Sequence, residues 1–127
     1  MRENNTFLVV DDNPLFREVF VDLLKMHFPE KTILEARDGE EACDVAAARH
    51  PCLVFMDYRM PGIDGFKATT AIKEENRNTR VMMLTNHNGL EYRAASERAG
   101  ADCYMNKDVA PGELVRAAKN LIGRTGC

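Results

Sequence analysis

The stretch Cys52–Asp57 reads CLVFMD, which is apolar at every position until it stops at an acid. A strand with one face in water alternates apolar and polar residues, whereas a strand buried on both faces is apolar throughout. The stretch is therefore typical of a central strand in a parallel sheet that has helices packed against both of its faces.

Four similar apolar runs lie elsewhere in the chain, and successive runs begin 20 to 28 residues apart. The segments between them carry helix signals, such as N-capping residues, prolines in the first turn and apolar residues at helical spacing. This alternation predicts an α/β fold, (βα)5, with a doubly wound five-stranded parallel sheet. The predicted strands are Phe7–Val10, Thr32–Ala36, Cys52–Met56, Arg80–Leu84 and Ala101–Met105. Helices are predicted to begin at Asn13-Pro14, at Asp38 with Glu41 as a capping box, at Asn88–Glu91 with an end at Gly100, and at Pro111.

The composition is that of one soluble domain. The chain has 127 residues and a net charge of −3, with 45% hydrophobic and 29% charged residues, which excludes a wholly disordered chain. The slight acidity argues against direct nucleic-acid binding, which requires a basic patch. No apolar run approaches the roughly 18 residues of a membrane span, and the first residues lack the apolar stretch of a signal peptide. We predict a single cytoplasmic domain over residues 1–127, with a core at about 6–122 and no membrane contact.

Four cysteines occur in the chain, at positions 43, 52, 103 and 127. No two of them lie two to four positions apart, so the paired spacing of a structural zinc site is missing. Cys52 and Cys103 sit in or beside apolar runs, where a cysteine behaves as a small buried hydrophobe. We predict reduced core thiols, with Cys127 able to cross-link in vitro.

Polar residues that could bind a ligand or take part in chemistry follow four of the five predicted strands. The carboxyl ends of parallel strands meet at one edge of a sheet, where ligands of open α/β sheets bind. Each residue taken alone is an ordinary turn residue or solvated side chain, but their concentration at one edge indicates a site. They are Asp11, Asp12, Asp57, Thr85, Asn86 and Lys107.

Three carboxylates at one edge would repel one another and raise one another's pKa. A divalent cation relieves that repulsion, and hard oxygen ligands suit Mg²⁺, which also keeps waters and a phosphate oxygen. Lys107 and Thr85 add a cation and a hydroxyl donor, as a phosphoryl group would need. The residues therefore predict an oxygen-lined metal site beside an anion receptor.

These residues resemble the receiver domain of two-component response regulators. The resemblance covers about Thr6 to Ile122 and implies a flavodoxin-like fold with strand order 2-1-3-4-5. The segment Asp11–Glu18 and the pair Lys107-Asp108 further resemble receivers that precede a helix-turn-helix DNA-binding output domain. The resemblance rests on Val9–Asp12, on the stretch Met56–Gly65 (MDYRMPGIDG), on Leu84-Thr85 and on Gly100–Lys107.

The resemblance implies a role for each residue at the predicted edge. Asp57 would attack the phosphorus of a phosphohistidine on a sensor histidine kinase or phosphotransfer protein, which gives an aspartyl phosphate. Mg²⁺ (or Mn²⁺) would be bound directly by Asp12, through water by Asp11, and by Asp57 and the backbone carbonyl of Arg59. Lys107, the Thr85 hydroxyl and the Asn86 N–H would bind the phosphoryl oxygens. Asp64-Gly65 would be structural, as the N-cap of the third helix.

The resemblance also implies a conformational switch. Thr85 would move toward the phosphoryl group and leave space into which Tyr104 turns. This would remodel the face of the fourth helix, fifth strand and fifth helix, where a partner or a second receiver, as a homodimer, would dock. Arg59 and His87 would tune the rate of phosphoryl loss, and we hypothesise that Arg59 lowers the affinity for Mg²⁺ by repulsion.

Other interpretations are weaker on the same residues. A receiver that acts only as an interaction module would not need Asp11, Asp12, Asp57, Thr85 and Lys107, all of which are present. A phosphatase-type hydrolase would carry its nucleophile after the first strand with a second aspartate two positions on, which Asp11-Asp12-Asn13 does not supply. A flavin binder would need a hydroxyl-rich phosphate loop there, and the two acids would repel that phosphate.

We therefore predict a phosphorylation-activated signalling switch rather than an enzyme, with only autocatalytic phosphotransfer and slow autodephosphorylation. It would control transcription if an output domain follows. The alternatives of a stand-alone protein and a receiver cut from a DNA-binding regulator stay open. Asp108 follows Lys107 where many receivers have proline, which makes a cis peptide there much less favourable.

Overall fold

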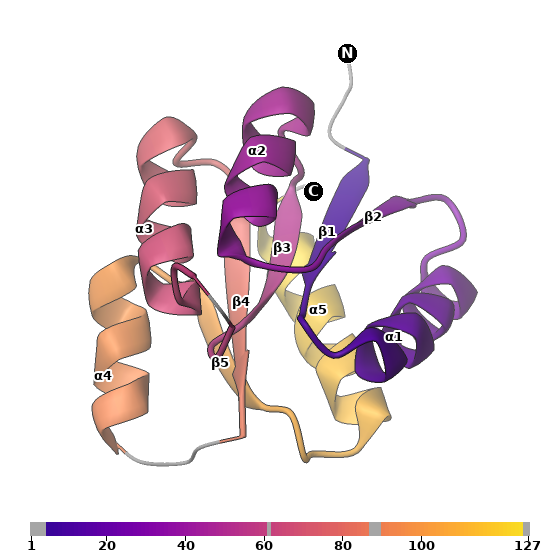
Figure 1. Cartoon of the computed structure of the whole chain (residues 1–127). Coiled ribbons are helices and arrows are strands. Elements are labelled where there is room, and N and C mark those ends of the chain that lie inside the picture. The colour runs from indigo at the N-terminus through magenta and orange to yellow at the C-terminus, as the bar shows by residue number, and fades with distance from the viewer. Residues whose placement is uncertain (1–4, 61, 87–89, 126–127) are drawn as a thin grey trace.

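The computed structural model describes the backbone of residues 5–60, 62–86 and 90–125 (Figure 1). Five parallel strands form one sheet in the order β2-β1-β3-β4-β5, and a helix follows each strand. This confirms the predicted α/β class and the strand order 2-1-3-4-5. The strands are β1 (Thr6–Val10), β2 (Thr32–Ala36), β3 (Leu53–Asp57), β4 (Arg80–Thr85) and β5 (Cys103–Asn106), and the helices are α1 (Pro14–His27), α2 (Gly39–Arg49), α3 (Gly65–Glu75), α4 (Leu90–Ala99) and α5 (Pro111–Thr125).

The strand ends differ from the predicted ones by one or two residues. β3 begins at Leu53 and extends to Asp57, which pairs with Leu84 of β4. β5 begins at Cys103 rather than at position 101 and continues to Asn106. Backbone pairing decides where a strand ends, so an apolar run locates a strand without marking its last residues.

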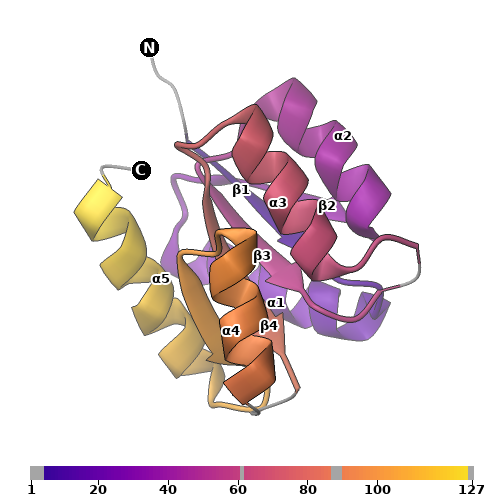
Figure 2. The same cartoon turned by 90° about the vertical axis from the view of Figure 1, so that its left-hand side faces the viewer.

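Different helices cover the two faces of the sheet (Figures 1 and 2). Phe7 of β1 lies in one apolar cluster with Leu24 of α1 and Leu114 of α5. Its neighbour Leu8 belongs to the opposite cluster, together with Ala68 of α3. Successive side chains of a strand point to opposite faces, so a strand with helices on both sides must be apolar at every position. The predicted reason for the continuous apolar runs is thereby confirmed for β1, β3 and β4, whereas the edge strands β2 and β5 are only partly buried.

Short polar side chains begin three of the helices. The Oδ1 atom of Asn13 accepts from the backbone N–H groups two and three residues on, and the Oδ1 atoms of Asp38 and Asp64 each accept from the N–H three residues on. The Asp38 cap is half of the predicted capping box. Its other half differs, because Glu41 accepts from the backbone N–H of Arg37, at 2.7 Å. The capping residue sets the entry of each helix at the edge where β1 and β3 end.

The remaining helix boundaries are also mostly as predicted. Gly100 follows α4 with φ of +97°, a left-handed conformation that favours glycine, and α5 begins at Pro111. The predicted cap at Asn88 and Gly89 lies outside the described residues. In the described part of the chain, no helix has the length and apolar character that a membrane span needs.

One of the cysteine predictions is wrong. Cys52 is 4% exposed, as expected of a core residue, but it is disulfide-bonded rather than reduced. Its apolar neighbours in the sequence account for burial, whereas a disulfide depends on which sulfur lies nearby in space. Cys43 and Cys103 are free thiols, as predicted, but they are half-buried rather than core residues, and Cys127 lies outside the described residues.

Asp102, which precedes β5, forms hydrogen bonds with α3 and β4. It lies at the end of the sheet opposite to the edge that carries Asp11, Asp12 and Asp57. Its Oδ2 accepts from Lys73 Nζ of α3 and from the backbone N–H of Val81 in β4, both at 2.9 Å. The backbone N–H of Asp102 in turn donates to the Val81 carbonyl at 2.8 Å.

Asp102→Ala is therefore expected to lower the free energy of unfolding by about 1–3 kcal/mol, because two charge-assisted hydrogen bonds at a partly exposed site are lost. Urea unfolding monitored by circular dichroism measures this loss. The matched control is Asp22→Ala, which removes the same charge from the exposed side of α1 and should change stability by less than about 0.5 kcal/mol. Equal effects of the two substitutions would show that the hydrogen bonds of Asp102 do not stabilise the fold.

Candidate functional site

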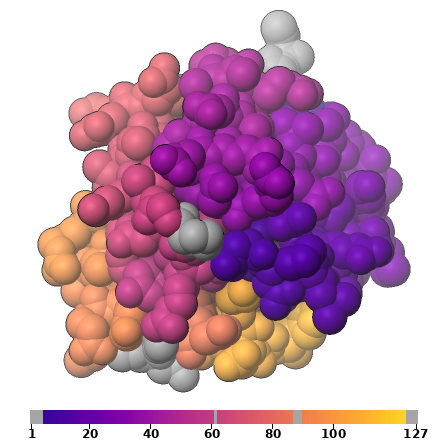
Figure 3. All heavy atoms as spheres, in the orientation of Figure 1, coloured from indigo at the N-terminus to yellow at the C-terminus, as the bar shows by residue number. Residues whose placement is uncertain are grey.

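A cleft of about 340 Å³ opens at the carboxyl ends of β1, β3, β4 and β5. On the surface, the start of α1 (indigo) lies beside α2 (purple), as Figure 3 shows. A larger groove of about 440 Å³ between α3 and α4 lies away from the three acids, so the chemistry points to the smaller cleft. That cleft is lined by Asp11, Asp12, Asn13, Asp57, Tyr58, Arg59, Thr85, Asn86 and Lys107.

The structure thus brings together every predicted metal-binding and anion-binding residue of the sequence. Arg59, one of the two predicted rate-tuning residues, is exposed at the cleft. The other, His87, lies outside the described residues. Asp12 and Asn86 are exposed as well, whereas Asp11, Asp57 and Thr85 are buried.

Asp11 is held at each of its polar groups. Its backbone N–H donates to the Ala36 carbonyl of β2 at 3.1 Å, and its carbonyl accepts from Arg17 at 2.6 Å. Its carboxylate accepts from the backbone N–H of Asn13 at 2.9 Å and from Lys107 Nζ at 2.7 Å. A carboxylate that is 1% exposed and bonded in this way has one orientation in the site.

Asp57 is the last residue of β3 and is 6% exposed. The two peptide groups that follow it are each held by a backbone hydrogen bond. The Tyr58 N–H donates to the Leu84 carbonyl at 3.0 Å, and the Tyr58 carbonyl accepts from the Gly65 N–H at 2.9 Å. Burial, reinforced by the nearby Asp11 charge, raises the pKa of Asp57 from 3.8 to about 7, although Lys107 opposes the shift. Near neutral pH the site therefore favours either a proton or a cation on this carboxylate.

The three acids converge in space. One carboxylate oxygen from each of Asp11, Asp12 and Asp57 lies within 4.8 Å of the others. Several hard oxygen donors with a concentrated negative charge fit Mg²⁺, which prefers carboxylate oxygen and retains part of its water shell. The donor chemistry predicted from the sequence is therefore present in the folded chain.

Lys107 stands between two of the acids. Its Nζ lies 2.7 Å from Asp11 Oδ2 and 3.7 Å from Asp57 Oδ1. The same Nζ lies 4.2 Å from the centre of the Phe16 ring, in a cation–π contact. The peptide between Lys107 and Asp108 is trans. The ammonium group is therefore placed beside the Asp57 carboxylate.

Thr85 and Tyr104 are related by the pairing of β4 with β5. Thr85 pairs with Asn106, and Met83 pairs with Tyr104. Residues two apart in a strand share a face, so Thr85 and Tyr104 are diagonal neighbours on one face of the sheet. Tyr104 is half-buried, packs against the apolar cluster on that face and lies 5.9 Å from the Arg93 guanidinium of α4.

The sequence predictions missed two residues that shape this site. Phe16 lies under the Lys107 ammonium, and Arg17 binds the Asp11 carbonyl. Gly65 was predicted to be structural at the start of the third helix, but its packing against the Asp57 backbone was not predicted. The contacts of Phe16 and Arg17 join residues that are distant in the sequence, and nothing in their local pattern distinguishes them from ordinary helix residues. The Asn13-Pro14 helix start is the one signal that could have drawn attention to Phe16 and Arg17, because it places them in the first turns beside the acids.

Comparisons with known proteins agree with the family that the sequence resembles. A family model described as the response regulator receiver domain matches residues 7–119. The chain is 31% identical over 117 residues to the nitrate/nitrite response regulator protein NarL of Escherichia coli (strain K12), which covers 91% of this chain and 54% of that protein. It is 35% identical over 112 residues to the probable transcriptional regulatory protein NarL of Mycobacterium tuberculosis (strain H37Rv), with coverage of 87% and 51%.

A solved structure of a two-component response regulator has a similar fold. The crystal structure of a LuxR-family two-component response regulator from Aurantimonas sp. SI85-9A1 has a TM-score of 0.88 and 30% sequence identity, over 95% of this chain and 86% of that one. The chain spans about half the length of the curated relatives that it matches.

Proposed function

The chain belongs to the response regulator receiver domain family of two-component systems, and we propose that it is a phosphorylation-controlled switch. Asp57 accepts a phosphoryl group from the phosphohistidine of a sensor histidine kinase or phosphotransfer protein. One observation carries this proposal. The buried Asp57 carboxylate faces the cleft with two further carboxylates within 4.8 Å and the Lys107 ammonium at 3.7 Å.

In the phosphoryl transfer, one bond to phosphorus forms and another breaks. A carboxylate oxygen of Asp57 attacks the phosphorus, the bond from phosphorus to the histidine nitrogen breaks, and that nitrogen keeps the electron pair. The product is an acyl phosphate on Asp57 and a neutral histidine on the partner. Phosphoryl transfer depends mostly on alignment and on neutralisation of charge, so the residues around Asp57 supply what the step needs.

Asp11, Asp12, Asp57 and the backbone carbonyl of Arg59 would hold Mg²⁺ (or Mn²⁺) in this site. When bound, the cation supplies positive charge that offsets the acids and the phosphoryl oxygens. Asp11 is oriented by its hydrogen bonds with Asn13 and Lys107, and Asp57 by its place at the end of β3. The exposed guanidinium of Arg59 would lower the affinity for the cation by repulsion, as hypothesised above.

Three groups at the cleft would bind the phosphoryl oxygens. Lys107 Nζ lies 3.7 Å from Asp57 Oδ1 and would donate a charged hydrogen bond to a phosphoryl oxygen. The hydroxyl of Thr85 and the backbone N–H of Asn86 would add two further donors from the end of β4. Arg59 and His87 would tune how fast water removes the phosphoryl group.

The output of the switch would follow from Thr85 and Tyr104. Movement of Thr85 toward the phosphoryl group would change the space available to Tyr104, its diagonal neighbour across β4 and β5. The face of α4, β5 and α5 would then present a different surface to an output domain, a partner or a second copy of the chain. Residues 1–127 would form one receiver domain, and in a longer protein with a DNA-binding output domain the switch would regulate transcription.

Phosphoryl acceptance is tested by the intact mass of the protein after incubation with Mg²⁺ and acetyl phosphate. The parent chain is expected to gain one phosphoryl group, and Asp57→Asn is expected to gain none, because its amide is not a nucleophile. Mass is preferable to intrinsic fluorescence, since the chain contains no tryptophan. Asp22→Asn on the exposed side of α1 is the control and should be phosphorylated like the parent. A parent chain that gains no phosphoryl group would instead be a silent interaction module.

A further inference from the structure

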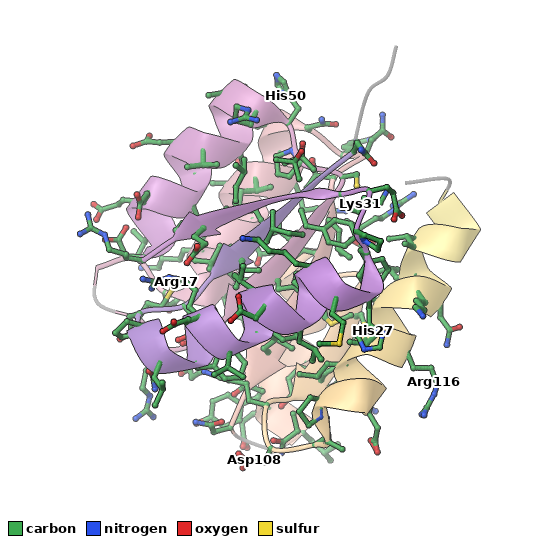
Figure 4. The ribbon with its side chains drawn as sticks, turned by 90° about the vertical axis from the view of Figure 1, so that its right-hand side faces the viewer. Arg17, His27, Lys31, His50, Asp108 and Arg116 are labelled. Atoms are coloured by element: carbon green, nitrogen blue, oxygen red, sulfur yellow. The ribbon has the colours of Figure 1, made fainter. Side chains whose placement is uncertain are left out.

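Arg17 of α1 connects three elements beside the acidic cleft. Its Nε donates to Glu35 Oε1 of β2 at 2.9 Å, and its Nη1 donates to the Asp11 carbonyl at 2.6 Å. The Arg17 side chain is 14% exposed, so most of it is buried between these partners. Figure 4 shows Arg17 at the start of α1, on the side that faces the end of β2.

The hydrogen bond from Arg17 affects Asp12 as well as Asp11, because of the peptide group to which the accepting oxygen belongs. The carbonyl of Asp11 belongs to the peptide group that joins Asp11 to Asp12, and a peptide group is planar. Fixing that oxygen therefore fixes the plane from which the Asp12 side chain departs. The preceding peptide is fixed too, because the Asp11 N–H donates to Ala36 at 3.1 Å. The peptide groups on both sides of Asp11 are thus held, which limits the directions in which the Asp11 and Asp12 side chains leave the end of β1.

Glu35 gives Arg17 its orientation. Guanidinium is a planar fork whose N–H groups point in fixed directions, so a carboxylate bound at Nε determines where Nη1 points. Glu35 lies near the end of β2, opposite Val9 in the pairing of β1 with β2. The Arg17 fork is therefore anchored on the sheet itself, next to the strand whose end carries Asp11.

We propose that Arg17, oriented by Glu35, is a positioning residue for the metal site that brings the Asp11 and Asp12 carboxylates together with Asp57. This inference rests on the proposed function, since it assumes that the three acids hold a divalent cation. Arg17 acts through the backbone of Asp11, and groups of this kind outside the ligand set commonly alter metal affinity by tenfold or more.

If Arg17 acted only through its charge, its removal would change metal affinity in the opposite direction. A cation near the site repels a metal ion, so removal of the charge alone would tighten metal binding. Loss of positioning would weaken binding, because Asp11 and Asp12 would no longer be held together with Asp57. The direction of the change in affinity therefore separates the two effects.

The experiment titrates the chain with Mn²⁺ and measures free Mn²⁺ by electron paramagnetic resonance, with Mg²⁺ as competitor. Arg17→Gln is expected to weaken Mn²⁺ binding about tenfold, and Arg17→Lys should also weaken it because an ammonium cannot make the same forked contact. The double variant Arg17→Gln/Glu35→Gln keeps the net charge of the parent and is expected to bind as weakly as Arg17→Gln. Unchanged or tighter binding in Arg17→Gln and in the double variant would overturn the proposal.

Two matched controls separate positioning from charge and from stability. Arg37→Gln removes a charge from an arginine that is 76% exposed and pairs with Glu41, and it should leave Mn²⁺ affinity unchanged or slightly tighter. Val21→Ala removes two methyl groups from the buried side of α1 and should lower stability without weakening Mn²⁺ binding. If Val21→Ala weakens binding as much as Arg17→Gln, the effect is general loosening of α1 and the proposal is wrong.

The same titration also keeps this inference distinct from the proposed function. A parent chain that binds no Mn²⁺ would overturn the metal site and the positioning role together. A parent chain that binds Mn²⁺ with an affinity equal to that of Arg17→Gln would overturn the positioning role alone.

Discussion

Asp57→Asn is expected to raise the free energy of unfolding by about 4 kcal/mol at pH 8 in the absence of divalent cations. The cause is the buried carboxylate, whose pKa lies at about 7 in the folded chain against an ordinary value of 3.8. At pH 8 the native protein must hold this group charged beside Asp11, whereas asparagine is neutral. The same substitution that is expected to remove phosphoryl acceptance should therefore stabilise the fold.

The direction of the pH dependence follows from the raised pKa. A carboxyl group whose pKa is higher in the folded state than in the unfolded state contributes stability below the unfolded value and loses it as the pH rises through the folded value. Without divalent cations, the Asp57 contribution should therefore fall between about pH 4 and pH 7. The advantage of Asp57→Asn should shrink to about 2 kcal/mol at pH 5.

Urea unfolding in a chelating buffer at pH 5 and pH 8 measures both values. Added Mg²⁺ should stabilise the parent chain and leave Asp57→Asn nearly unchanged, because a ligand stabilises only the state that binds it. Asp22→Asn, on the exposed side of α1, should show neither effect. A stability difference between Asp57→Asn and the parent that does not vary with pH would contradict the raised pKa.

Gly65→Ala is expected to lower the free energy of unfolding by about 2–4 kcal/mol, because there is no room for its side chain. A Cβ at position 65 would lie 2.3 Å from the Asp57 carbonyl oxygen and 2.9 Å from Tyr58 Cα. Both contacts are with backbone, which cannot turn away as a flexible side chain could. The start of α3 would have to move away from the end of β3.

The same displacement should reduce phosphoryl acceptance, since the Gly65 N–H donates to the carbonyl of Tyr58, the residue after Asp57. Urea unfolding measures the loss of stability, and the initial rate of mass gain with acetyl phosphate measures the loss of function. Gly112→Ala is the matched control, because a Cβ there meets nothing within 4 Å, and it should be neutral or slightly stabilising. A Gly65→Ala variant as stable as the parent would show that the two backbones separate at little cost.

Much of the fold followed from local pattern. The run at Leu53–Met56 is apolar at every position because β3 is buried on both faces, and the same logic located the other four strands. The acids at positions 11, 12 and 57 could be placed at one edge because parallel strands end on the same side of a sheet. Their convergence within 4.8 Å bears out that placement.

Other features required the folded chain. Cys52 looked like a reduced core thiol, yet it is disulfide-bonded, because burial can be inferred from apolar neighbours while a disulfide partner cannot. Asp57 was expected to have a raised pKa from nearby acids, but burial is the larger cause and depends on the packing around β3. The capping box at Asp38 had the right residues, but Glu41 reaches Arg37 instead of the cap itself.

The sequence by itself determined the class of fold, the order of its elements and the residue types at the sheet edge, because these depend on the spacing of apolar residues along the chain. Only the tertiary structure decided how the edge is held together. Lys107 meets Asp11 across 96 positions of sequence, Arg17 joins the end of β1 to β2, and Gly65 touches the backbone of Asp57. Such contacts depend on where helices pack on the sheet, and side-chain periodicity specifies which face a helix buries but not which single atoms meet there.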